Sequence, residues 1–176
     1  CYPEGSITGS VSVTNQFYND GNTSLEMTYQ FAVSTETQAA YMDFTTPVAI
    51  SGTPTALKLS IYGNHSGDWV RGRIIDAEGT VHVIDFTRDM SWDGWQEMTA
   101  EIPDGVVYPI SLKTVYVAAL QNTDTNPRTV RFDRLNAAVP NTASISVPEN
   151  PKVRDVKEGQ VGENTAEGYF INIAGN

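Results

Sequence analysis

The segment Ala56-Leu57-Lys58-Leu59-Ser60-Ile61-Tyr62 decides the fold class, because apolar and polar residues alternate along it. Successive side chains of a β-strand point to opposite faces, so the leucines and the isoleucine would share a buried face. Lys58, Ser60 and Tyr62 would then lie on the other face. The segment Leu25-Glu-Met-Thr-Tyr-Gln-Phe31 has the same alternation. Both segments therefore predict strands with one buried face.

Five further runs have the composition of strands and are bounded by Gly, Pro, Asn or Asp: residues 69–75, 80–86, 96–102, 114–120 and 129–135. The segment Asp76-Ala-Glu-Gly79 predicts a turn between two strands, and Asn19-Asp-Gly-Asn22 predicts a turn before one. No long amphipathic helix is expected. Short strands at this spacing predict an all-β fold, an antiparallel β-sandwich of the jelly-roll type.

The length of 176 residues fits one domain with a tail. Near Ala137 the composition changes to one rich in Pro, Asn and Ser, which is typical of a linker. We therefore expect a β-sandwich module over residues 1–138 and a linker within residues 139–176. The last residues, 169–176, have the pattern of a buried strand. They would begin a following domain or add an edge strand to the sandwich, and both interpretations stay open.

The charge and the single cysteine exclude several classes of partner and site. Asp and Glu outnumber Lys and Arg by 21 to 11, which gives a net charge of -10 and disfavours nucleic acid and anionic lipid as partners. No apolar run approaches the roughly 20 residues of a membrane span. Cys1 cannot form a disulfide within the chain. It is either an exposed end or the lipid-modified first residue of a mature bacterial lipoprotein.

Several short motifs occur in a characteristic order. They are Asp20-Gly-Asn-Thr-Ser-Leu25, Gly52-Thr-Pro54, Tyr62-Gly-Asn-His-Ser-Gly-Asp-Trp-Val-Arg-Gly72, Asp76-Ala-Glu-Gly79, Trp92-Asp-Gly-Trp95, Glu101-Ile-Pro103 and Val130-Arg-Phe-Asp-Arg-Leu135. In this order and spacing, the stretch from Asn19 to Leu135 resembles the galactose-binding-like jelly-roll modules of secreted bacterial proteins. Such modules are attached to carbohydrate-active enzymes, phosphodiester glycosidases and some metallophosphoesterases. The chain departs from many of them at Asn64, where an Asp commonly follows the Gly.

The resemblance implies a structural calcium ion near the start of the sandwich. Its ligands would come from the turn before the second strand and from the last strand, at Asp20, Asn22, Ser24 and Asp133. Calcium prefers six to eight oxygen ligands from carboxylates, amides and carbonyls. In the alternative interpretation, Asp20 and Asn22 only form the turn, and Asp133 pairs with an arginine.

Alternation also predicts a ligand-binding face. Trp69, Arg71 and Arg73 would share one side of their strand, and Tyr62 and Arg131 would join them if their strands are neighbours. Aromatic rings pack on the apolar faces of sugars, and arginine forks bind hydroxyl and carboxylate groups. This set would suit a sugar polymer, including one with uronic acids or other anionic groups. In the alternative interpretation, the arginines pair with acidic residues of the chain and Trp69 covers the core.

The two remaining tryptophans are expected to differ in role. Trp92 would lie at a loop rim and contact the ligand, and Trp95 would belong to the core.

No motif for nucleophilic catalysis, zinc hydrolysis or phosphate binding is present, and nothing singles out Asp85 or Glu97 as a catalytic carboxylate pair. We therefore expect no catalytic residue. The leading hypothesis is an extracellular, non-catalytic module that binds polysaccharide or oligosaccharide and targets an attached enzyme to glycan. The alternative hypotheses are a structural domain that orients a neighbouring catalytic domain, and a glycan-degrading enzyme of the jelly-roll type.

Overall fold

A computed structural model of the chain describes residues 1–4 and 7–140. The expected linker and terminal strand, apart from residues 139 and 140, lie outside the described residues. Within the described part the strands are β1 (Thr8–Thr14), β2 (Ser24–Gln30), β3 (Gln38–Ile50), β4 (Ala56–Asn64), β5 (Trp69–Ile75), β6 (Val81–Thr87), β7 (Asp93–Glu101), β8 (Ile110–Ala119) and β9 (Arg128–Ala138). None of these residues belongs to a helix long and apolar enough to cross a membrane.

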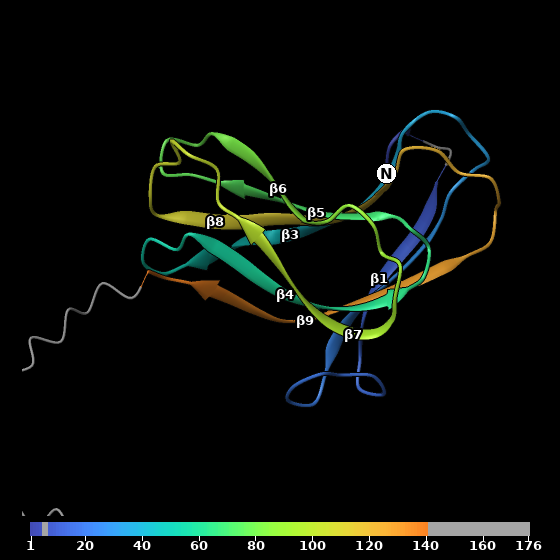
Figure 1. Ribbon diagram of the computed structural model, residues 1–176, viewed down its shortest axis with the longest axis horizontal. Coiled ribbons are helices and arrows are strands. Elements are labelled where there is room, and N and C mark those ends of the chain that lie inside the picture. The colour runs from blue at the N-terminus through green and yellow to red at the C-terminus, as the bar shows by residue number, and fades with distance from the viewer. Residues whose placement is uncertain (5–6, 141–176) are drawn as a thin grey trace, which may run out of the picture. The chain divides into compact units, whose positions relative to one another are not determined.

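The strands form two antiparallel sheets packed face to face (Figure 1). The five-stranded sheet has the order β1-β2-β9-β4-β7, and the four-stranded sheet has the order β3-β8-β5-β6. In Figure 1 the four-stranded sheet lies above the layer that contains β4, β9 and β7. The predicted all-β antiparallel sandwich is confirmed.

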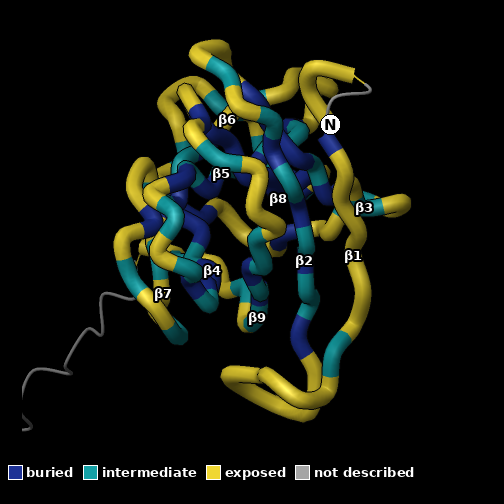
Figure 2. The backbone as a smooth tube through the Cα atoms, turned by 90° about the vertical axis from the view of Figure 1, so that its right-hand side faces the viewer, coloured by how far each residue is buried: buried dark blue, intermediate teal, exposed yellow. Residues whose placement is uncertain are grey.

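The core lies between the sheets and is built from the alternating positions that the sequence indicates. Leu57, Leu59 and Ile61 of β4 are all buried, as are alternate residues of β2 from Met27 onward. Val70 and Ile74 of β5 supply the opposite wall. Figure 2 shows the buried stretches on the inner strands, whereas β1, at the edge, is exposed along most of its length.

Two strands have no counterpart in the sequence prediction. β1 has the sequence TGSVSVT and lies at a sheet edge, where no buried face imposes an apolar pattern. In β3 the pairing with β8 shifts between Asp43 and Val48, so the alternation is interrupted. Both strands therefore lack the regular pattern by which the other strands were predicted.

The connection from β4 to β5 carries the chain from one sheet to the other and is held by a buried polar network. The Tyr29 hydroxyl donates a hydrogen bond to Asp68 Oδ2 at 2.8 Å. Arg128 Nη1 lies 3.2 Å from Asp68 Oδ1 and 3.0 Å from Oδ2. Burial raises the pKa of Tyr29, and it also raises the pKa of Asp68 against the opposing effects of its hydrogen-bond partners and the Arg128 charge. The network joins β2, β9 and the connection into one unit.

Candidate ligand-binding face

The outer surface of the four-stranded sheet, here called the four-stranded face, gathers aromatic and arginine side chains in register. Tyr41 of β3 lies opposite Tyr116 of β8, and Tyr116 lies opposite Arg71 of β5. On the far side Arg71 faces Asp85 of β6. Along β5, Trp69 and Arg73 flank Arg71 on the same surface, because alternate residues of a strand share a face.

The arginines of this face stack on its aromatic rings. The Arg73 guanidinium carbon lies 4.7 Å from the ring centre of Tyr41 and 5.3 Å from that of Tyr116. Trp69 is flanked by two arginines, with Arg71 at 5.5 Å and Arg88 at 5.2 Å from its ring centre. At these distances the cations are attracted by the electron-rich faces of the rings. The face is therefore a row of arginine–aromatic stacks.

Asp85 forms ion pairs with two of the three arginines. Its carboxylate accepts hydrogen bonds from Arg71 Nε and, at 2.8 Å, from Arg88 Nη2. Burial would raise the pKa of Asp85, but these hydrogen bonds and charges outweigh it and hold the pKa below its usual range. Arg73 differs, since the side-chain hydrogen bond that it forms to the described residues goes from Nη2 to the Tyr41 hydroxyl at 3.4 Å. Among the described residues, no carboxylate pairs with Arg73.

Tyr62 and Arg131 lie on the outer surface of the other sheet, here called the five-stranded face. Arg131 pairs with Glu26 at 2.7 Å and stacks over Phe17 at 4.2 Å and Tyr62 at 5.2 Å. The expectation of one shared face is therefore wrong. The strands β4 and β5 are consecutive in sequence but belong to different sheets, which separates Tyr62 and Arg131 from Trp69, Arg71 and Arg73.

Trp92 and Trp95 do not lie where the sequence placed them, since Trp92 packs against the core and Trp95 lies on an outer surface. Trp92 is half-buried and packs against the core, and its indole Nε1 is buried without a hydrogen-bond partner among the described residues. Trp95 instead lies on the five-stranded face, edge-on to Tyr62 with ring centres 5.4 Å apart. β7 begins at Asp93, earlier than the predicted strand at residues 96–102, so Trp95 is already within the sheet.

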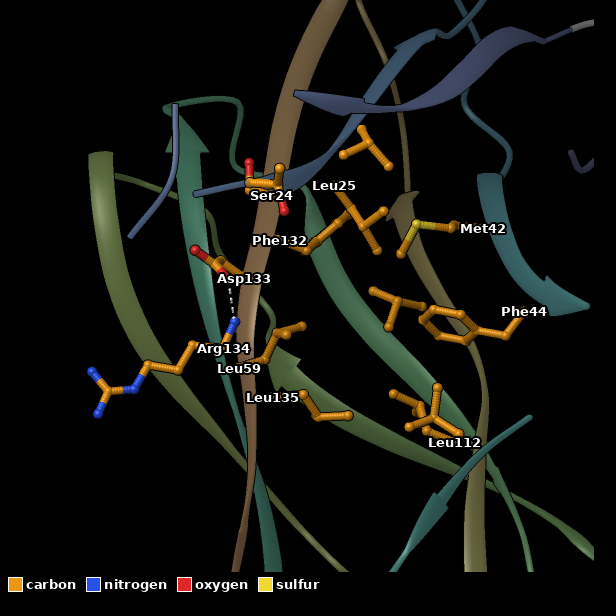
Figure 3. A pocket seen from close by; sticks show the side chains of 14 residues that line it. Ser24, Leu25, Met42, Phe44, Leu59, Leu112, Phe132, Asp133, Arg134 and Leu135 are labelled. Atoms are coloured by element: carbon orange, nitrogen blue, oxygen red, sulfur yellow. Dashed lines mark hydrogen bonds between the residues drawn. The ribbon is translucent and has the colours of Figure 1, made fainter. Parts of the chain in front are cut away.

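Three of the four residues expected to bind calcium, Asp20, Ser24 and Asp133, are engaged in other interactions. Asp133 accepts backbone N–H groups from Asn19 and Asp20 on Oδ2, at 2.7 and 2.9 Å. Its Oδ1 accepts the Arg134 N–H at 2.7 Å, the dashed contact in Figure 3. The Ser24 hydroxyl donates to the Phe17 carbonyl at 2.5 Å.

The charges in this turn also do not favour a cation. The Arg134 guanidinium lies 3.8 Å from the Asp20 carboxylate, so a positive charge is already close to it. Asn22 is exposed in the turn. Within the described ranges, no three His, Cys, Asp or Glu residues form a group that could hold a metal ion. As arranged, these residues form a hydrogen-bonded turn closure and do not fit a calcium ion.

A cavity of about 300 Å³ opens between the sheets, near this turn. Apolar side chains of both sheets form most of its wall, including Met42, Leu59 and Phe132 (Figure 3). The Arg134 side chain extends away from it, so the cavity has no guanidinium inside. No residue of the four-stranded face lines it. The cavity is therefore separate from the candidate ligand-binding face.

Sequence reasoning found three members of the four-stranded face and missed Tyr41, Tyr116 and Arg88. Tyr116 lay within a predicted strand, and the alternation of Thr114, Tyr116 and Ala118 would have placed it on the outer side. Tyr41 lies in β3, where the pattern is interrupted. Arg88 follows the end of β6, and no periodic signal places it beside Trp69.

Comparison with known proteins gives structural similarity only. No family model matches the sequence, and no curated protein matches it significantly. A solved structure described as a basis for the promiscuous specificity of carbohydrate-binding modules of the β-sandwich superfamily superposes with a TM-score of 0.54 at 18% identity. The match covers 74% of this chain and 53% of that one, so the chain spans about half its length.

Two further matches superpose more loosely. The family 11 carbohydrate-binding module of a Clostridium thermocellum cellulosomal cellulase has a TM-score of 0.42 at 8% identity, covering 76% of this chain and 83% of that chain. A module solved with β-1,4-galactotriose, TmCBM61, has a TM-score of 0.40 at 13% identity, and the match covers 74% of this chain and 86% of that chain. The first comparison shows that this chain shares the β-sandwich fold of a carbohydrate-binding module.

Proposed function

We propose that the chain is a non-catalytic module that binds polysaccharide through the four-stranded face. The observation that carries the proposal is the gathering of Trp69, Tyr41 and Tyr116 with arginines on one sheet surface. Aromatic side chains offer apolar surface to sugar rings, and guanidinium groups offer several N–H donors to their oxygens. The fold shared with a carbohydrate-binding module supports this assignment, although a fold alone does not determine function.

In this proposal the module acts outside the cell and is attached to a catalytic domain. Binding to a polymer would hold the attached enzyme near its substrate and raise its effective concentration there. The motifs between Asn19 and Leu135, which resemble those of secreted accessory modules, support this setting.

A structural role is the second candidate. Arg71 is paired with Asp85, and Tyr116 is only 5% exposed, so part of the four-stranded face is satisfied without a ligand. A domain of this kind would orient a neighbouring catalytic domain and bind no sugar. Retention on a polysaccharide distinguishes the two candidates.

Affinity electrophoresis on a panel of neutral and acidic polysaccharides tests the proposal. We expect retardation on at least one polymer, and we expect Trp69→Ala to abolish most of it. Trp95→Ala is the matched control, because it removes a half-buried indole from the other sheet and should keep the retardation. The absence of retardation on every polymer, or an undiminished retardation of Trp69→Ala, would count against the proposal.

A further inference from the structure

We infer that the polysaccharide bound by the four-stranded face is acidic, and that Arg73 binds a carboxylate of its sugar units. This inference rests on the proposed function, and it specifies the class of polysaccharide that the face selects.

The Arg73 guanidinium lies over the rings of both Tyr41 and Tyr116, so a sugar bound at this position would meet the guanidinium as well as the aromatic rings. A guanidinium stacked on a ring keeps its N–H donors in its own plane, at its edge. Within the part of the chain that the structure describes, the Arg73 side chain forms one hydrogen bond, and at 3.4 Å it is long. The donors of Arg73 are therefore a prominent polar feature of this part of the face.

The acidic residues near Arg73 on this face have other partners. Asp85 is already shared between Arg71 and Arg88. Thr114 of β8 lies between Arg73 of β5 and Asp43 of β3 in the sheet. Asp43 accepts a hydrogen bond from the Thr114 hydroxyl at 2.6 Å. Within the described residues neither carboxylate forms an ion pair with Arg73. Thus Arg73 keeps an unneutralised charge on a protein with a net charge of -10.

A planar guanidinium binds a carboxylate with two parallel hydrogen bonds, which a hydroxyl cannot match. The net negative charge of the chain repels a polyanion at long range, but salt screens exposed charges beyond about 8 Å at physiological ionic strength. The contact at Arg73 is therefore expected to decide which polymer binds.

Isothermal titration calorimetry with matched polymers tests the inference. The probes are polygalacturonate and alginate, each beside its carboxyl-reduced, neutral derivative. We expect wild-type protein to bind an acidic polymer about 10-fold or more tightly than its reduced derivative, as loss of a charge-assisted hydrogen bond implies. Arg73→Gln should remove that preference. Arg73→Lys should keep only part of it, because lysine has the positive charge but lacks the two parallel N–H donors of a guanidinium.

The control is Arg134→Gln, which makes the same charge change on the other sheet, at a side chain that is 52% exposed. It should bind like wild type. Equal binding of acidic and reduced polymers by wild type would overturn the inference and leave the proposed function standing. An unchanged preference in a folded Arg73→Gln protein would also overturn it. Lack of binding to these polymers and to every polysaccharide of the wider panel would overturn both.

Discussion

The Asp133 carboxylate joins residues 19 and 20 to β9 through hydrogen bonds from their backbone N–H groups. The resemblance implies a calcium ligand, whereas both oxygens of this carboxylate accept backbone N–H groups. Those donors come from residues 19 and 20 as well as from the neighbouring residue 134, so the contact joins segments more than a hundred positions apart. A carboxylate satisfied in this way stabilises the loop without a metal ion.

We expect Asp133→Ala to lower the free energy of unfolding by about 1–2 kcal/mol, since the N–H groups lose their acceptor but remain accessible to water. The measurement is urea unfolding, together with thermal melts in millimolar calcium and in EDTA. Both melts of the wild-type protein should have the same midpoint, because a ligand raises stability only where it binds the folded state.

Asp104→Ala is the control for this comparison, since Asp104 is exposed and its loss should change stability little. A calcium-dependent rise in the wild-type melting temperature that disappears in Asp133→Ala would contradict the account and restore the calcium site.

The success of the sequence prediction at single residues depended on unbroken alternation. It placed Trp69, Arg71 and Arg73 together on one side of β5, and it placed Arg131 on the side of β9 away from the core. For Trp92 alternation gave no guidance, because Trp92 precedes β7 and its packing depends on a contact with another strand. Long-range contacts of this kind leave no periodic signal in the sequence.

At the scale of elements, the sequence did not predict which strands pair with one another in the two sheets. Strand composition and turns predicted most of the strands, including the β5–β6 turn, where the Gly79 N–H donates to the Asp76 carbonyl at 3.0 Å. The order of strands within a sheet depends on how loops cross between layers. The connection between β4 and β5 makes such a crossing, and its polar composition resembles that of an ordinary hairpin loop.

The packing of Trp92 on β4 depends on a glycine. A Cβ atom at Gly63 would lie 2.7 Å from Trp92 Nε1 and 2.8 Å from Cδ1, and it would also clash with the Trp92 backbone oxygen. We expect Gly63→Ala to cost about 3 kcal/mol or more, as overpacking against backbone cannot be relieved by a rotamer change. Urea unfolding followed by tryptophan fluorescence would measure the loss.

Gly72→Ala is the matched comparison within β5. A Cβ there would meet the flexible Ile84 side chain at 3.0 Å and a ring carbon of Phe86 at 3.2 Å. Because a side chain can move aside, we expect a smaller cost of about 1–3 kcal/mol. A ranking in which Gly63→Ala is the milder substitution would show that Trp92 does not depend on this close approach.

At the scale of the whole molecule, the buried pair of Asp68 and Arg128 links the two sheets. Asp68 stands directly before β5 of the four-stranded sheet, and Arg128 begins β9 of the five-stranded sheet. Their side chains are 5% and 16% exposed, so water cannot replace a lost partner easily. Arg128 also bonds Asn122 at 2.7 Å and Asp124 at 3.0 Å, which extends the network to the loop after β8.

We expect Arg128→Met to lower the free energy of unfolding by about 3–5 kcal/mol, because it leaves the Asp68 carboxylate buried without its cation. Arg134→Met, on the same strand but 52% exposed, should cost far less. The double substitution Arg128→Met with Asp68→Leu should recover part of the lost stability, since it also removes the carboxylate that would be buried without a cation. Equilibrium unfolding in urea measures the free energy of unfolding of the wild type, the two single variants and the double variant. If Arg128→Met and Arg134→Met proved equally mild, the pair would not hold the sheets together, and apolar packing alone would account for the junction.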